Sequence, residues 1–107
     1  PVNHGLDTPC IDAIVAVFKQ FPSVCWVRLY GSRATGQYKK QSDIDLAYFD
    51  EAPKSQRTSI YTKLMDVPTL LHIDLTEYNA ITHKGLLQHI DSVGVTLYSS
   101  SQEGARG

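Results

Sequence analysis

Two short runs in the first half of the chain, LYGSRATG at residues 29–36 and SDIDL at residues 42–46, are its most informative segments. The residues that lead into the first run, 24–30, are rich in β-branched and aromatic side chains and are followed directly by Gly31. This pattern predicts a buried strand that ends in a tight turn. Residues 32–42 are small, polar and basic, so we expect a short helix followed by a loop.

The second run predicts a strand that carries two carboxylates on one face. Residues 43–49 alternate in character, so that Asp43 and Asp45 project to one side while Ile44 and Leu46 project to the other. Parallel carboxylates can jointly hold a hard cation, because Mg²⁺ prefers carboxylate oxygens together with substrate phosphates and retained waters. The pair therefore predicts a magnesium site.

The junction of Gly31 and Ser32 is a candidate phosphate site. A strand that ends in Gly-Ser at the start of a helix presents free backbone N–H groups and a hydroxyl. Glycine lets a phosphate approach the backbone closely. Lys39 and Lys40 follow in the loop, where they would steer an anion or simply face water.

The remaining apolar residues recur with helical or alternating spacing. We expect helices from Asp7 to about Phe21, over residues 53–65 and over residues 81–90, and strands over residues 70–76 and 94–98. Helices that alternate with strands predict an α/β fold, a sheet of three to four strands with helices packed on it. We expect one domain, residues 1–98, and a flexible polar tail, residues 99–107.

A third carboxylate falls in phase on the expected strand 70–76, where His72, Asp74 and Thr76 share one face. Asp74 on an adjacent strand would complete a site for two metal ions about 3.5–4 Å apart, the spacing used for displacement at phosphorus. Glu77 lies one pleat out of phase, and a slipped strand end would exchange the two roles. Three carboxylates so close together repel one another without cations, so the cluster predicts Mg²⁺ dependence.

Composition narrows the function classes. The 107 residues carry 10 Lys and Arg against 11 Asp and Glu, a formal net charge of −1, so no global basic field favours nucleic acid or a membrane surface. No apolar stretch is long enough to span a bilayer, and no secretory leader is visible, so we expect a cytoplasmic protein. Cys10 and Cys25 lack the spacing of a metal or redox pair, and both are expected to be buried apolar residues.

The spacing from Gly31-Ser32 to Asp43-x-Asp45 resembles the signature of the DNA polymerase β-type nucleotidyltransferase superfamily. The fuller string, which includes Gly36 and Ser42, resembles its minimal nucleotidyltransferase (MNT) branch, many members of which are encoded beside a helical HEPN partner in toxin–antitoxin pairs. This resemblance implies a mixed sheet of the polymerase β palm type and nucleotidyl transfer with loss of pyrophosphate. For the toxin–antitoxin branch it implies AMP transfer from ATP to a tyrosine hydroxyl of the partner.

The resemblance also assigns roles to individual residues. Asp43 and Asp45 would bind both Mg²⁺ ions, and Asp74 would be the third metal ligand and the deprotonating group. The residues expected to bind the nucleotide are Gly31 and Ser32, at the β- and γ-phosphates, together with Arg33 and Ser42. We therefore expect a magnesium-dependent nucleotidyltransferase that modifies a partner protein, an antitoxin of a HEPN/MNT pair.

Other interpretations stay open at this stage. The chain could instead be a binding module that neutralises its partner by covering it, or a sensor that binds a nucleotide without transferring it. The base preference, the acceptor and the choice between a homo-oligomer and a heteromeric interface are not encoded in any motif. His72 is expected to be a partly exposed structural residue, and no role is assigned to the other histidines, His4, His83 and His89.

Overall fold

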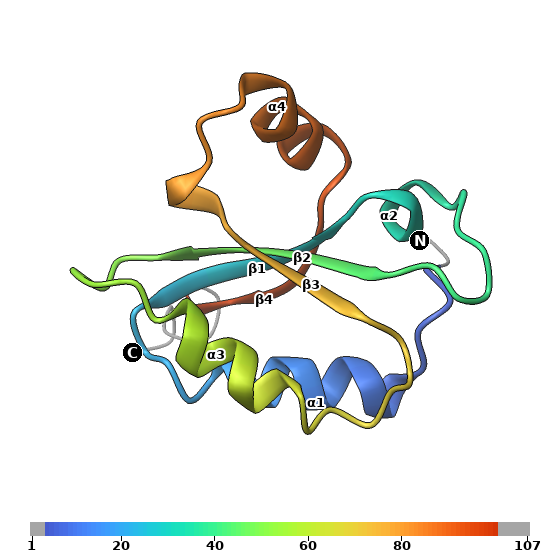
Figure 1. The fold of residues 1–107 in the computed structure, drawn as a ribbon, viewed down its shortest axis with the longest axis horizontal. Coiled ribbons are helices and arrows are strands. Elements are labelled where there is room, and N and C mark those ends of the chain that lie inside the picture. The colour runs from blue at the N-terminus through green and yellow to red at the C-terminus, as the bar shows by residue number, and fades with distance from the viewer. Residues whose placement is uncertain (1–3, 101–107) are drawn as a thin grey trace.

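The computed structural model describes residues 4–100 and contains one four-stranded mixed sheet (Figure 1). Its strands are β1 (Val24–Tyr30), β2 (Ile44–Asp50), β3 (Ile73–Glu77) and β4 (Val95–Ser99), and they lie in the order β3-β2-β1-β4. Strand β1 is antiparallel to both of its neighbours, whereas β2 and β3 are parallel. The predicted α/β fold with a small mixed sheet is confirmed.

The helices cover the two faces of this sheet unequally. They are α1 (Thr8–Phe18), α2 (Ser32–Thr35), α3 (Arg57–Leu64) and α4 (Lys84–Val93), with a 3₁₀ turn, η1, at Tyr78–Ala80. Helices α1 and α3 lie together under one face, and α4 lies over the other (Figure 1). The short α2 sits at the end of β1. The face that carries α4 is therefore the less covered one.

Helix α1 begins where the sequence predicts it. The Asp7 carboxylate caps it by accepting a hydrogen bond from the Cys10 N–H at 3.0 Å, and Pro9 occupies the first turn, where no N–H is required. The helix ends at Phe18, and two further turns of the i to i−3 type carry the chain to Phe21. Its buried face packs on the sheet.

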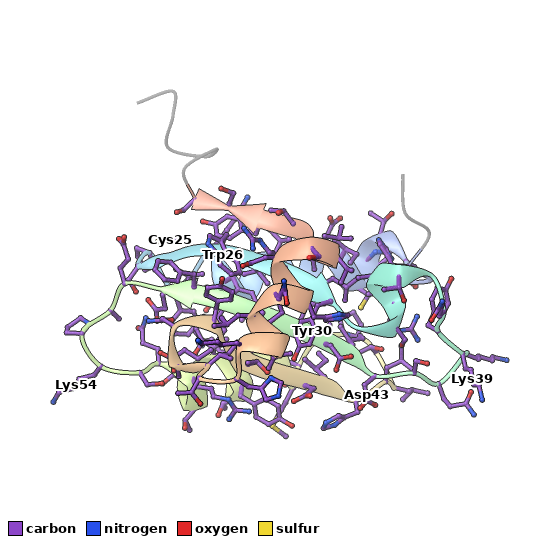
Figure 2. The ribbon with its side chains drawn as sticks, turned by 90° about the horizontal axis from the view of Figure 1, so that it is seen from above. Cys25, Trp26, Tyr30, Lys39, Asp43 and Lys54 are labelled. Atoms are coloured by element: carbon purple, nitrogen blue, oxygen red, sulfur yellow. The ribbon has the colours of Figure 1, made fainter. Side chains whose placement is uncertain are left out.

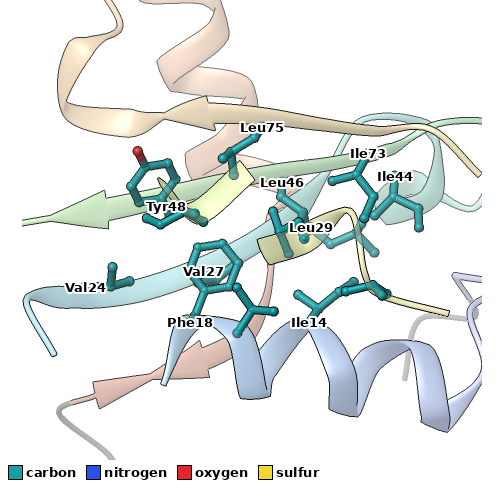
Figure 3. Packing of buried hydrophobic residues seen from close by; sticks show 14 of the residues in the cluster. Ile14, Phe18, Val24, Val27, Leu29, Ile44, Leu46, Tyr48, Ile73 and Leu75 are labelled. Atoms are coloured by element: carbon teal, nitrogen blue, oxygen red, sulfur yellow. The ribbon is translucent and has the colours of Figure 1, made fainter. Parts of the chain in front are cut away.

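The alternation predicted for β2 decides which side chains enter the main core. Ile44, Leu46 and Tyr48 are fully buried between the sheet and helices α1 and α3 (Figure 3). Asp45 and Ala47 point to the opposite face, where Ala47 joins a second, smaller cluster beneath α4. The carboxylate of Asp45 thus lies outside the main core, on the less covered face.

Several predicted boundaries are wrong by a few residues. Helix α3 begins at Arg57, not at residue 53, and α4 begins at Lys84, because η1 and an extended segment take up residues 78–83. The His83 side chain caps α4 by accepting from the Leu86 N–H at 3.0 Å. Strand β3 begins at Ile73 rather than at residue 70.

The C-terminal segment and one of the two cysteines differ from the predictions made from the sequence. The predicted tail begins inside the fold, since Ser99 ends β4 and the Ser100 hydroxyl donates to the Cys25 carbonyl at 3.2 Å; residues 101–107 lie outside the described part. Cys10 is buried as predicted, but Cys25 is only half-buried, because an irregularity in the β1–β2 pairing between Val24 and Trp26 turns it out of phase. No helix within residues 4–100 is long and apolar enough to cross a membrane.

Candidate active site

The predicted carboxylates meet where β1 ends and β2 and β3 begin. Tyr30 is the Cα partner of Asp45 in the β1–β2 pairing, and Asp45 is the Cα partner of Asp74 in the β2–β3 pairing. Paired residues on neighbouring strands point to the same face about 5 Å apart. Asp43 directly precedes β2 and is exposed at the same end, as Figure 2 shows in a view onto the α4 face. The three predicted metal ligands therefore share one region.

This register also separates the two candidates for the third carboxylate. Asp74 lies beside Asp45, whereas Glu77 pairs with Tyr48 farther along the strands. The Glu77 carboxylate accepts a hydrogen bond from the Ser55 hydroxyl at 2.7 Å. The geometry thus favours Asp74 as the partner of Asp45.

Gly31 brings the backbone against the Asp45 carboxylate. Its φ of 73° and ψ of −154° lie in a region that is open essentially only to glycine. A Cβ atom placed at Gly31 would clash with Asp45 Oδ2. The turn glycine predicted from the sequence is therefore required by the backbone conformation, and any side chain at this position would displace the Asp45 carboxylate.

Electrostatics identify Asp45 as the most perturbed member of the carboxylate group. Burial raises the pKa of Asp45 above its usual value, and the charges of Asp74 and then of Asp43 raise it further. His72 and His89 act in the opposite direction on the same carboxylate. Asp45 is thus held in a negative, partly desolvated environment that a cation would neutralise.

The donor set fits a hard divalent cation by its chemistry, since it consists of carboxylate oxygens on one open face. Within residues 4–100, however, no group of three or more His, Cys, Asp or Glu side chains is gathered tightly enough to enclose a metal ion. The side chains of Asp43, Asp45 and Asp74 would therefore have to adjust around an ion and the phosphates of a substrate.

The turn after Gly31 leaves polar groups available to an anion. The Gly31 carbonyl accepts hydrogen bonds from the Ala34 and Thr35 N–H groups at 3.1 and 3.2 Å, which forms the short helix α2. Among the described residues, the Ser32 and Arg33 N–H groups donate to no other backbone group, and the Ser32 hydroxyl has no hydrogen-bond partner. Ser32 is half-buried and thus remains a candidate for phosphate contact.

The geometry does not support the predicted phosphate contact of Arg33. Its guanidinium donates to the carbonyls of Ser42 at 3.0 and 3.1 Å, His4 at 2.9 Å and Lys40 at 3.3 Å. It also lies 4.8 Å from the ring centroid of Tyr38, and the residue is only 2% exposed. The buried Arg33 side chain therefore stabilises the loop between α2 and β2 from its inner side.

Ser42 takes part in the same loop structure. Its hydroxyl accepts a hydrogen bond from the Lys39 N–H at 2.7 Å, while its carbonyl accepts from Arg33. These bonds form the turn that delivers the chain to Asp43. Here too, the observed contacts do not support direct nucleotide binding, and they give the residue a part in placing the first carboxylate.

We expect Arg33→Ala to lower the free energy of unfolding in urea by about 2–4 kcal/mol. The substitution removes a buried side chain and leaves several backbone carbonyls without a hydrogen-bond donor. Arg57 supplies a matched control: it is exposed, donates to the Leu75 carbonyl at 3.0 Å and lies 5.8 Å from the Tyr61 ring centroid. Arg57→Ala should cost less than about 1 kcal/mol. Equal losses in the two variants would show that the Arg33 contacts do not order the loop.

His89 is a residue of this site that the sequence analysis missed. Its Nε2 atom accepts a hydrogen bond from the Gly31 N–H at 3.1 Å, across 58 residues of sequence. Its ring also meets the ring of Tyr30 edge-on, with the centroids 6.0 Å apart. No spacing signal links helix α4 to the turn, so only the tertiary structure could reveal this contact.

Known structures resemble this fold at low sequence identity. One is a chain from the crystal structure of a toxin–antitoxin complex with AMP-PNP, with a TM-score of 0.70 and 22% identity over 87% of this chain and 76% of that chain. Another comes from the complex of a tri-AMPylated Shewanella oneidensis HEPN toxin with an MNT antitoxin, with a TM-score of 0.64 and 19% identity over 91% of this chain and 76% of that one. A third is a nucleotidyltransferase-like protein of Sulfolobus solfataricus, with a TM-score of 0.52 and 17% identity over 92% and 94% of the two chains.

A comparison with curated protein sequences finds no significant match. The family model "Polymerase beta, Nucleotidyltransferase", in contrast, matches residues 12–103, which include the Gly-Ser turn and all three aspartates. The superfamily predicted from the sequence is thereby confirmed. The chain is a nucleotidyltransferase domain and belongs to the polymerase beta family.

Proposed function

We propose that this protein is a magnesium-dependent transferase that moves AMP from ATP to a hydroxyl group of a partner protein. The observation that carries the proposal is the pairing of Asp45 with Asp74 across β2 and β3, directly beside the Gly31 turn. Two adjacent carboxylates next to an anion-binding turn suit the transfer of a phosphorus-centred group. Asp43 would extend the same ligand set.

The proposed reaction forms one P–O bond and breaks another. The acceptor oxygen attacks the α-phosphorus of ATP, and the bond to the pyrophosphate leaving group breaks in line with it. Asp74 accepts the proton of the acceptor hydroxyl, while Ser32 contacts the β- and γ-phosphates. Mg²⁺ held by the three aspartates would supply charge neutralisation at the phosphates. Arg33 and Ser42 would act only by positioning the loop before Asp43.

The nature of the partner is proposed from the structural neighbours. The complexes that resemble this fold include one with AMP-PNP and one in which a HEPN toxin is AMPylated and bound to an MNT antitoxin. We infer by similarity that the partner of this chain is a helical HEPN-type protein and that the chain acts as its antitoxin. Asp74 is exposed on β3, so its carboxylate is accessible to the hydroxyl of such an acceptor.

Incubation with ATP labelled at the α-phosphate, Mg²⁺ and the co-expressed partner tests this function. We expect label on the partner, its loss when EDTA removes the metal and its return when Mg²⁺ is restored. Labelled GTP in a parallel reaction measures the base preference. A tight complex that never acquires label would instead support a neutralising binding module, and nucleotide binding without any transfer would support a sensor.

A further inference from the structure

We propose that His89 is a positioning residue of the transfer reaction, which holds the Gly31 turn, and with it the Asp45 carboxylate, in the geometry that the reaction needs. The inference rests on the proposed function. It begins with the 3.1 Å hydrogen bond from the Gly31 N–H to His89 Nε2. An imidazole nitrogen that accepts a hydrogen bond is unprotonated, so this contact requires the proton of a neutral ring to be on Nδ1.

The contact places His89 one step from a metal-binding carboxylate. Gly31 lies so close to Asp45 that even a methyl group at the glycine would clash with Oδ2. A shift of the turn would therefore be transmitted to that carboxylate, as well as to the adjacent Ser32.

The His89 ring contacts Gly31 and Tyr30, and its neighbours on α4 hold the helix in place. Its neighbour Ile90 is fully buried in the small cluster that packs α4 onto the sheet. The ring meets Tyr30 edge-on, and the Tyr30 hydroxyl is in turn hydrogen-bonded to Thr76 on β3 at 3.0 Å. The next residue, Asp91, accepts from the Tyr78 hydroxyl at 2.8 Å. The imidazole is thus a fixed acceptor and not a freely rotating surface group.

The same bond changes which groups of the turn face a phosphate. Because the Gly31 N–H is directed at His89, it is not available to the substrate. The remaining donors of the turn are the Ser32 and Arg33 N–H groups and the Ser32 hydroxyl, none of which has a partner among the described backbone or side-chain groups. With the Gly31 N–H bonded to His89, any contact of this turn with a phosphate would come from Ser32 and Arg33.

Two substitutions separate the hydrogen-bond acceptor of His89 from the aromatic packing of its ring. His89→Phe keeps the aromatic contact with Tyr30 but cannot accept a hydrogen bond, whereas His89→Gln offers an amide oxygen at similar reach. Gln88→Ala, at an exposed neighbouring position on α4, controls for changes to the helix. For each protein, the affinity for Mg²⁺ and AMP-PNP is measured by calorimetry, kcat and KM for ATP by partner labelling, and Tm by thermal unfolding.

We expect His89→Phe to lose about tenfold or more in both AMP-PNP affinity and kcat/KM, because the Gly31 turn loses the bond that holds it and shifts to pair its N–H elsewhere, which displaces Ser32 and the Asp45 carboxylate. His89→Gln should stay within about threefold of the unaltered protein, and Gln88→Ala should match it. Unchanged affinity and kcat/KM in His89→Phe would overturn the proposal, as would equal losses in the Phe and Gln variants. A lowered Tm with unchanged kinetics would show a merely structural role.

Failure of the proposed transfer activity can be distinguished from failure of the role proposed for His89. If the unaltered protein binds AMP-PNP but labels no partner, the transfer activity is refuted, while the affinities of the Phe and Gln variants still decide the role of His89. If the unaltered protein binds no AMP-PNP in the presence of Mg²⁺, both proposals are refuted.

Discussion

Replacement of Asp45 by asparagine should reduce AMP transfer by about a thousandfold or more and, at neutral pH without metal, raise the thermal stability of the protein. The loss of activity follows because an amide is a poor ligand for Mg²⁺ and cannot replace the central carboxylate of the site. The gain in stability follows because burial, Asp74 and Asp43 all raise the pKa of Asp45. Partner labelling and Tm measured in EDTA check the two effects separately.

The pH dependence of this stability gain has a definite sign. A carboxyl group whose pKa is higher in the folded protein than in the unfolded chain binds its proton more tightly when folded. Its ionisation therefore destabilises the fold, and the cost appears as the pH rises from about 4 through the raised pKa of Asp45. The Tm of Asp45→Asn should exceed that of the unaltered protein by a few degrees at pH 7, and the two values should converge in acid.

Asp50, on the same strand, provides a control because its pKa is shifted in the opposite direction. Burial by itself would raise the pKa of Asp50, but hydrogen bonds from Ser23, Gln56 and the Ala52 N–H lower it below its usual value. Its charge therefore stabilises the fold above the ordinary pKa of a carboxyl group, and that contribution is lost as the pH falls. Asp50→Asn should lower Tm at pH 7 and leave transfer by the folded protein unchanged. A lower Tm for Asp45→Asn as well would contradict the electrostatic interpretation of the site.

The two features of the site that local periodicity could predict are the phase of the carboxylates and the turn that precedes them. Alternation places Asp43 and Asp45 on one face of a strand, and the same rule places Asp74 on the corresponding face of its own strand. Such a pattern is local, because it follows from the geometry of one strand at a time. That the two strands would be neighbours was part of the two-metal hypothesis and is not encoded in the pattern of either strand; the observed pairing of Asp45 with Asp74 confirms it.

The roles of Arg33 and His89 depended on contacts that no local pattern encodes. An arginine beside a candidate phosphate turn looks like a phosphate ligand. The direction of Arg33 is instead set by the carbonyl of Ser42, in the loop before β2, and by that of His4, in the segment before α1. His89 follows Gly31 by 58 residues and meets it only because Ile90 packs α4 onto the sheet. The predicted burial of Cys25 was wrong for a similar reason, because an irregularity in the pairing of β1 with β2 changes which side chains of the strand face the core.

Substitution of Gly31 by alanine should impair both stability and catalysis, and Gly36 allows the two causes to be separated. Both glycines have positive φ, 73° and 82°, so alanine introduces backbone strain at either position. Only at Gly31 does the added methyl group also meet the Asp45 carboxylate; at Gly36 nothing lies within 4 Å of the new atom. The two variants therefore differ in steric contact with the site. They also differ in strain, because the conformation of Gly31 (ψ −154°) is open essentially only to glycine, whereas that of Gly36 (ψ 6°) is the ordinary left-handed one.

For Gly36→Ala we expect a loss of about 1 kcal/mol, the ordinary cost of the left-handed conformation, with kcat/KM of the folded protein unchanged. For Gly31→Ala we expect a loss of about 2–3 kcal/mol and at least a hundredfold lower kcat/KM, because the carboxylate must move away from the position in which it would hold the proposed metal ion. Urea unfolding and partner labelling at a temperature where both variants are folded provide the measurements. If Gly31→Ala kept its kcat/KM while losing stability, the contact between the turn and Asp45 would be a matter of packing alone and could not set the geometry of transfer.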